Sequence, residues 1–134
     1  MKRIVALACL ALFALTLAAE SYKAPVVVKE MGFGAKLEGG KVIFAWKQYL
    51  RDDLKYYKLV KSKTNPNPVY PEDGYIFVGD REARGWVEEK PEPGVWYYRL
   101  CIITNGGERW VSPVIKLEIK AASGGVPTSK DFGD

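Results

Sequence analysis

Short apolar runs separated by clusters of turn-forming residues make up the chain from Val26 onward. No stretch keeps an apolar period of 3.6 residues over three helical turns, whereas several runs alternate between apolar and polar residues. Glycine reaches positive φ, and proline fixes φ and lacks an amide hydrogen, so clusters of these residues end a strand. Clusters of turn-forming residues lie at 39–40, 51–53, 65–68, 71–74, 91–94 and 105–107, of which 51–53 has two aspartates in place of glycine or proline. The pattern therefore predicts an all-β protein.

Seven strands are expected between these clusters. They are residues 41–47, 55–62, 75–78, 84–88, 95–104 and 108–120, with an opening strand at 26–29. A single open sheet would leave one apolar face uncovered, so this number of short strands predicts a two-sheet antiparallel β-sandwich.

Alternation within the strands indicates which side chains face the core. Val42, Phe44 and Trp46 share one face of their strand. In the longest strand, Trp96, Tyr98, Leu100 and Ile102 share one face, opposite Tyr97, Arg99 and Cys101. Because Cys101 lies among Leu100, Ile102 and Ile103, we expect a buried, unreactive thiol there.

Four segments resemble the fibronectin type III family over residues 26–120. The run 41–46 is similar to that family's second strand, with an apolar residue two places before the core residue Trp46, and residues 57–62 are similar to its third strand. Residues 93–100 resemble its turn and sixth strand, and 105–107 followed by 112–114 resemble its last hairpin. The resemblance implies a sandwich scaffold, and such scaffolds serve adhesion, spacing, ligand binding and filament assembly alike.

One position departs from the family pattern. The family usually has a tyrosine where Trp96 aligns, and the hydroxyl of that tyrosine bonds back to the backbone. Either Trp96 takes this role through its indole nitrogen, or Tyr97 takes it in a shifted register.

Residues 1–19 have the features of a secretory signal peptide: Lys2 and Arg3, an apolar run, and small residues at 18–19. Alternatives are a retained membrane anchor, for which the apolar run is short, and lipidation at Cys9. We expect a domain at 20–120, a flexible tail at 121–134, and export to the periplasm, the cell surface or the medium, with no stable membrane span after cleavage.

The composition disfavours catalysis. The chain has no histidine, so it lacks the commonest general base and metal ligand, and we expect neither an enzyme nor a cofactor or metal. The acidic pairs at 52–53, 72–73 and 88–89 fit solvated charges better than a glycosidase acid and base. Asp52, Asp53, Asp73 and Asp80 lack the alternating spacing of a calcium loop. The net charge of +4 falls to +2 without Lys2 and Arg3, too little to indicate nucleic acid.

Aromatic residues and one strand edge are the remaining candidates for binding. The chain has four tryptophans and eight tyrosines, and those that the predicted core leaves least constrained include Tyr70, Tyr75, Trp86 and Trp110. Val26, Val27 and Val28 could be donated to the sheet edge of a neighbouring subunit. The sequence thus favours a non-catalytic interaction module at the cell surface, with self-assembly into a filament or surface layer as its sharper form. The alternative is a carbohydrate-binding module that holds polysaccharide on exposed aromatic rings.

Overall fold

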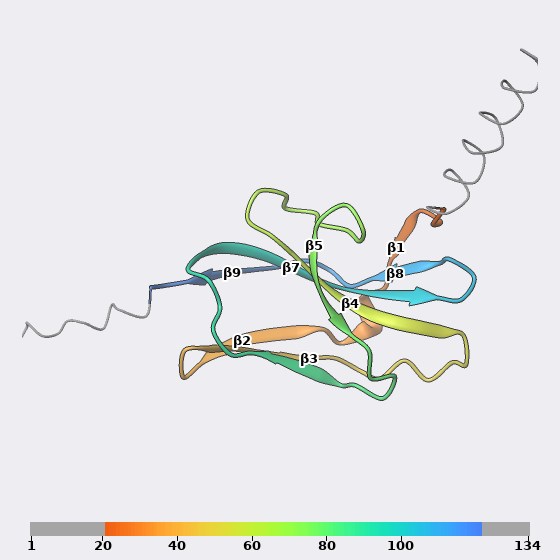
Figure 1. The fold of residues 1–134 in the computed structure, drawn as a ribbon, viewed down its shortest axis with the longest axis horizontal. Helices are drawn as coiled ribbons and strands as arrows, with labels where there is room; N and C mark the ends of the chain where they lie inside the picture. Colours follow the sequence, from red (N-terminus) through yellow and green to blue (C-terminus); the bar gives the residue numbers. More distant parts are fainter. Residues whose placement is uncertain (1–20, 122–134) are drawn as a thin grey trace, which may run out of the picture.

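Two β-sheets pack face to face in the computed structural model, which describes residues 21–121 (Figure 1). The larger sheet has six strands in the order β1 (Pro25–Val27), β8 (Arg109–Val111), β7 (Gly94–Thr104), β4 (Leu54–Ser62) and β5 (Gly74–Val78), while β9 (Ile115–Ile119) pairs with the first part of β7. The smaller sheet has three strands in the order β2 (Gly34–Glu38), β3 (Lys41–Ala45) and β6 (Gly85–Glu88). A single 3-10 turn, η1 (Lys29–Met31), joins β1 to β2.

This architecture confirms the predicted all-β sandwich and differs from the prediction in three places. The strand β2 was not expected, because glycine, alanine, lysine and glutamate are poor strand formers. The predicted strand 108–120 is two strands, since Pro113 lacks an amide donor and the Ser112 hydroxyl accepts the Leu100 amide at 3.0 Å instead. The pairing of β1 with β8 is parallel, whereas every other pairing in residues 21–121 is antiparallel.

The core between the sheets contains the side chains that the alternation placed there. Trp46 is buried, packs at 5.5 Å from the ring of Tyr57, and donates its indole N–H to the Ala83 carbonyl at 3.0 Å. Phe44 meets Tyr98 edge to face with ring centroids 4.9 Å apart. The inward faces of both sheets are therefore closed by apolar contacts, with the indole donor of Trp46 satisfied.

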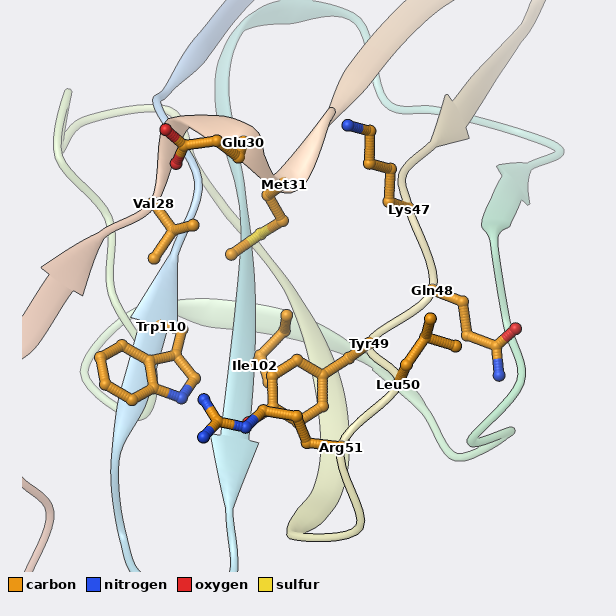
Figure 2. A pocket seen from close by; sticks show the side chains of 10 residues that line it. All are labelled: Val28, Glu30, Met31, Lys47, Gln48, Tyr49, Leu50, Arg51, Ile102 and Trp110. Carbon is orange, nitrogen blue, oxygen red and sulfur yellow. The ribbon is translucent and has the colours of Figure 1, made fainter.

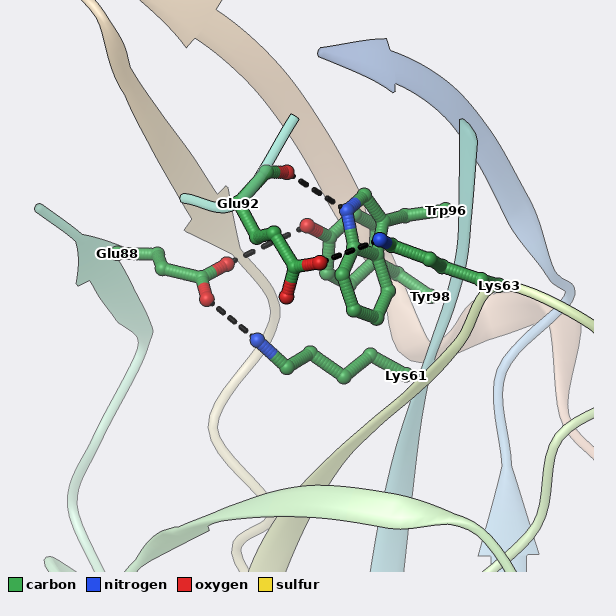
Figure 3. A network of polar contacts seen from close by, with 6 residues as sticks. All are labelled: Lys61, Lys63, Glu88, Glu92, Trp96 and Tyr98. Atoms are coloured by element: carbon green, nitrogen blue, oxygen red, sulfur yellow. Dashed lines mark hydrogen bonds and ion pairs between the residues drawn. The ribbon is translucent and has the colours of Figure 1, made fainter. Parts of the chain in front are cut away.

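Trp96 replaces the corner tyrosine expected from the fibronectin type III pattern. Its indole N–H donates to the carbonyl of Glu92, four residues upstream, at 2.8 Å (Figure 3). The ammonium groups of Lys61 and Lys63 lie 4.8 and 5.2 Å from its ring centroid. Of the two alternatives for this corner, the structure shows the first, and Tyr97 is not needed for the role.

A polar network next to Trp96 ties β4 to β6 across the open side of the sandwich (Figure 3). The Lys61 ammonium lies 2.6 Å from one carboxylate oxygen of Glu88, and the Tyr98 hydroxyl donates to the other at 3.3 Å. Burial, followed by the negative charge of Glu88, raises the pKa of Tyr98 well above its usual range. The phenol therefore stays a hydrogen-bond donor at any physiological pH.

The outward face of the larger sheet carries a second core beneath residues 63–73, which we call the cover loop. Figure 1 shows this connection between β4 and β5 on the side of the larger sheet away from the smaller one. The buried side chains of this second core are Val60, Cys101, Ile103 and Val111 of the sheet and Tyr70 of the cover loop itself. Burial raises the pKa of the Cys101 thiol to about 12, so the predicted buried, unreactive cysteine lies here.

Two buried arginines hold the cover loop to the sheet. Arg99 donates to the carbonyls of Ser112 at 2.7 Å and Pro68 at 3.4 Å. Arg109 donates to the carbonyls of Lys23 at 2.7 Å and Tyr70 at 2.8 Å. Loop carbonyls that have no strand partner are thus satisfied by guanidinium groups.

The predicted signal peptide and nearly all of the predicted tail lie outside the described residues. Between residues 21 and 121 there is no helix long and apolar enough to cross a membrane.

Candidate binding surfaces

An apolar cleft opens at one end of the sandwich, where β1, η1 and β8 approach the segment between β3 and β4. We call it the end cleft; its volume is about 440 Å³. Figure 2 shows the side chains of Met31 and Ile102 inside it, with Trp110 on one side and Tyr49 on the other. The lining residues are Val28, Glu30, Met31, Lys47, Gln48, Tyr49, Leu50, Arg51, Ile102 and Trp110.

Hydrogen bonds fix the wall of the end cleft that Tyr49 contributes. Its amide donates to the Tyr57 hydroxyl at 2.8 Å, and its own hydroxyl donates to the Asp53 carboxylate at 2.8 Å. Burial and the neighbouring Asp53 carboxylate both raise the pKa of Tyr49, so the phenol remains a donor. The wall is therefore ordered before any ligand arrives, which lowers the entropy cost of binding.

The rim of the end cleft combines one exposed apolar side chain with charged groups. Leu50 is 81% exposed, the highest exposure among the large apolar side chains of residues 21–121. The lining also includes Lys47, Arg51 and Glu30, which bring two positive charges and one negative charge to the cleft. An apolar floor with a polar rim is the usual anatomy of a binding site for an apolar anchor.

A second surface lies on the outward face of the larger sheet, around a lysine enclosed by aromatic rings. The Lys58 cluster consists of Lys58 with Tyr56, Tyr70, Tyr75 and Phe77. The Lys58 ammonium is 4.2 to 4.8 Å from the centroids of all four rings. Its side chain is only 6% exposed, and the part of the chain that the structure describes places no carboxylate within ion-pair distance of it. Burial lowers its pKa, and the ring faces stabilise the cation in place of a carboxylate.

The structure sorts the aromatic residues singled out from the sequence into three places. Tyr70 and Tyr75 come together in the Lys58 cluster, with ring centroids 4.8 Å apart. Tyr70 itself is buried, at 8% exposure, so its side chain is not free for a partner. Trp110 is half-buried in the end cleft, and Trp86 is apart from both surfaces, 38% exposed on β6.

The valines proposed as a donated strand occupy a place in the chain's own sheet. Val26 pairs with Trp110 and Val27 with Val111, and the amide of Val28 donates to the Val111 carbonyl at 2.7 Å. Donation to a neighbour would therefore require β1 to leave β8.

The acidic residues considered for calcium have other partners or stand apart. Asp53 accepts from Tyr49, Asp73 accepts from the Val69 amide at 3.0 Å, and Asp80 accepts from the Glu82 amide at 2.9 Å. Nowhere in residues 21–121 do three acidic, cysteine or histidine side chains gather as a metal site would need.

Sequence reasoning missed Met31, Tyr49, Leu50 and Lys58 as parts of these surfaces. Tyr49 and Leu50 adjoin the turn cluster at 51–53, and the apolar pair there was the available signal, since exposed loop residues are often functional. Lys58 gave no signal, because a lysine in an alternating strand normally faces solvent.

Comparisons with known proteins support the fold. No protein-family profile and no curated protein matches the chain. Solved structures with this fold include the FN1–FN3 domains of chicken CNTN1, with a TM-score of 0.53 and 10% identity over 73% of this chain and 33% of that one. The sixth fibronectin type III domain of human fibronectin type III domain containing protein 3 has a TM-score of 0.51 and 12% identity over 81% of this chain and 98% of that domain.

A third similar structure is that of an enzyme. Pectate lyase PelI from Erwinia chrysanthemi, solved in complex with tetragalacturonic acid, has a TM-score of 0.51 and 14% identity over 63% of this chain. The match spans only 27% of the lyase chain. Residues 21–121 thus have a fibronectin type III-like fold, and among these structures the fold occurs both as a separate domain and as one part of a larger enzyme chain.

Proposed function

We propose that the protein is an exported, non-catalytic interaction module that binds a protein partner through the end cleft. The single observation that carries the proposal is the cleft itself: an apolar floor of Met31 and Ile102, rigid aromatic walls, and the exposed Leu50 on the rim. Aromatic and aliphatic anchors in a pocket with a polar rim supply most of the affinity of protein interfaces. Export rests on the sequence of residues 1–19.

The chemistry of the end cleft favours binding over catalysis. Glu30 is the single carboxylate among its lining residues, so it has no acid and base pair of carboxylates. The thiol of Cys101 lies under the cover loop on the opposite face of the larger sheet, with a pKa of about 12, and is therefore unsuited to nucleophilic attack.

Selection of peptides on the immobilised protein tests this proposal. A random displayed library should yield peptides with a leucine, methionine or aromatic anchor. Trp110→Ala should weaken their binding at least tenfold, measured by calorimetry, because it removes one wall of the cleft. Trp86→Ala, a matched change outside the cleft, should leave the affinity unchanged. Equal losses in both variants, or peptides that bind both equally well, would contradict the proposal.

The second candidate function is carbohydrate binding. It draws on the aromatic faces of Trp110 and Tyr49 beside the hydrogen-bonding groups of Gln48 and Arg51, a combination that also suits a sugar ring. Two of the four tryptophans, Trp46 and Trp96, are buried in the core and take no part. An oligosaccharide array that includes tetragalacturonic acid distinguishes the two functions. Binding of an oligosaccharide to the unaltered protein but not to Trp110→Ala would favour carbohydrate binding.

Self-assembly through strand edges is the further part of this proposal. A module of this kind can associate through an unpaired edge, where main-chain groups supply the hydrogen bonds. The sequence analysis named Val26–Val28 as the edge that pairs. Repeated association through strand edges would build a filament or a surface layer.

A further inference from the structure

Five strands of residues 21–121 have an unpaired side, and four of them carry a feature that hinders pairing with another chain. These are β1, β9 and β5 in the larger sheet and β2 and β6 in the smaller one. Charged side chains and proline are the usual means by which edge strands avoid association. β1 has three residues and begins with Pro25, β2 contains Lys36 and Glu38, β9 contains Lys116 and Glu118, and β6 ends with Glu88 beside Glu89.

β5 is the exception among these edges. Its sequence is Gly-Tyr-Ile-Phe-Val, without charge or proline. The four residues after the glycine are aromatic or β-branched, which are the types that favour strand pairing. One side pairs with β4 from Gly74↔Lys61 to Val78↔Tyr57. No strand of the described chain pairs with the other side.

We propose that β5 is the edge through which two copies of this chain associate, by antiparallel β5–β5 pairing about a two-fold axis at Ile76. The inference rests on the proposed strand-edge self-association and names a different edge from β1. Antiparallel pairing about Ile76 sets Tyr75 of one copy opposite Phe77 of the other, twice, and aligns all five residues of the strand. Residues opposite each other in antiparallel strands share a face, so each aromatic pair lies on the outward face.

The exposure of the outward-facing residues fits such an interface. Phe77 is 54% exposed and Tyr75 is 44% exposed, and they are neighbours on the same face of β5. About half of the surface of each of these two residues is thus left for a second copy to cover. A two-fold interface requires a surface that complements itself, and an uncharged strand meets this condition without like-charge repulsion.

The other members of the Lys58 cluster hold the rings of Tyr75 and Phe77 in fixed positions. The Lys58 ammonium lies 4.2 Å from the centroid of Tyr75 and 4.5 Å from that of Phe77. Tyr70 contacts Tyr75 edge to face at 4.8 Å, and Tyr56 contacts Phe77 in the same way at 5.6 Å. Rings held in this manner lose little side-chain entropy on binding, which favours a stable complex over a transient one.

A pair of matched double variants tests the proposal by sedimentation velocity on the purified protein. In Tyr75→Glu/Phe77→Glu, each new carboxylate can pair with Lys58 in the monomer, but four of them face one another across the two-fold axis. We expect the dimer dissociation constant to rise at least a hundredfold, while the circular dichroism spectrum of the folded monomer is retained. Val26→Glu/Val27→Glu places the same charges on β1, where the exposures of 49% and 52% are similar, and the dimer should persist.

Cross-linking tests the position of the axis. In a Cys9→Ser background, Ile76→Cys should give a disulfide-linked dimer on oxidation, because residue 76 faces its own copy, whereas Val26→Cys should not. A parent protein that is monomeric at every concentration overturns the proposal, as does a dimer that survives the β5 variant or is lost in the β1 variant. If the β5 edge instead binds a peptide from the displayed library in a monomeric protein, its occupant is a different chain and the proposal is wrong. Trp110→Ala changes only peptide binding, so failure of the end cleft and failure of this interface are distinguished.

Discussion

Each face of the six-stranded sheet carries a buried core, yet the two cores are covered in different ways. The inward face packs against a second sheet, whose backbone groups are largely satisfied by their own ladder, and its contacts are almost entirely apolar. The outward face packs against the cover loop, and three cationic side chains, Lys58, Arg99 and Arg109, are buried with it. A loop brings carbonyls that need donors, so covering a sheet with a loop requires polar side chains that covering it with another sheet does not.

Loss of an inward-facing anchor should have the largest effect. Trp46→Ala removes a buried ring that contacts Tyr57 and leaves the Ala83 carbonyl without its donor. The free energy of unfolding should fall by about 3–5 kcal/mol, measured by urea denaturation. Leu50→Ala, at the exposed rim of the end cleft, should change it by no more than about 0.5 kcal/mol. Similar values for the two variants would mean that Trp46 does not anchor the inward core.

Loss of a cation under the cover loop should have an intermediate effect. Arg109→Met leaves the carbonyls of Lys23 and Tyr70 without donors, and we expect a loss of about 1–3 kcal/mol. The matched control is Glu72→Gln, which removes only the exposed ion pair at 3.6 Å and should cost well under 1 kcal/mol. If the control costs as much as Arg109→Met, the ion pair and not the carbonyl bonds holds the loop.

The Cys101 thiol reports on the same region without unfolding the protein. In the native protein it should react slowly with a thiol reagent, because the cover loop buries it and its pKa is about 12. In Arg109→Met, each 1.4 kcal/mol lost from local closure should speed labelling about tenfold. Fast labelling of the unaltered protein would show that the outward face is open.

The smallest effect is expected at Lys58, where burial and the four rings act in opposite directions. Lys58→Met keeps the apolar stem and removes the charge, so the change in stability at neutral pH should be below about 1 kcal/mol. Because burial lowers the folded-state pKa below the ordinary value of 10.5, the folded protein releases this proton at a lower pH than the unfolded chain does. The stability of the unaltered protein relative to Lys58→Met should therefore rise as the pH approaches 10.5.

Denaturation of both proteins at several pH values measures this difference. The raised pKa of Tyr98 acts in the opposite direction above pH 10, but it is common to both proteins and largely cancels. A flat difference would show that Lys58 is charged to the same extent in the folded and unfolded states.

The core on the inward face of the six-stranded sheet was predictable from the sequence, whereas the core on the outward face was predicted only at Cys101. Alternation alone assigned Trp46 and Tyr98 to the core and put Cys101 on the opposite face from Tyr98, because a strand has a period of two. The fibronectin type III resemblance supplied the corner that Trp96 occupies. These signals are local, or are shared by a family of sandwiches.

The outward core depends on contacts between residues far apart in the chain. Arg99 donates to the carbonyl of Pro68, and Arg109 donates to that of Tyr70. No sequence pattern around the arginines or in the cover loop predicts these contacts. The Lys58 cluster and the burial of Tyr70 also depend on contacts between distant residues, so the sequence did not predict them. The end cleft was not predicted. Val28 was named only as part of a strand edge and Trp110 only as an aromatic candidate, and the opposing wall of Tyr49 and Leu50 lies in a loop whose path only the whole fold determines.

The parallel pairing of β1 with β8 also determines how the domain would respond to tension. The two ends of the described chain lie at opposite ends of the sandwich (Figure 1), and β8 leads onward into β9 toward the far end. A pull on both ends therefore draws β1 and β8 in opposite directions along their common axis. The hydrogen bonds between β1 and β8 are therefore loaded in shear. They must break together and not one after another. A protein that joins two bodies through its ends would gain resistance to stretching from these three residue pairs, which lie in line with the force.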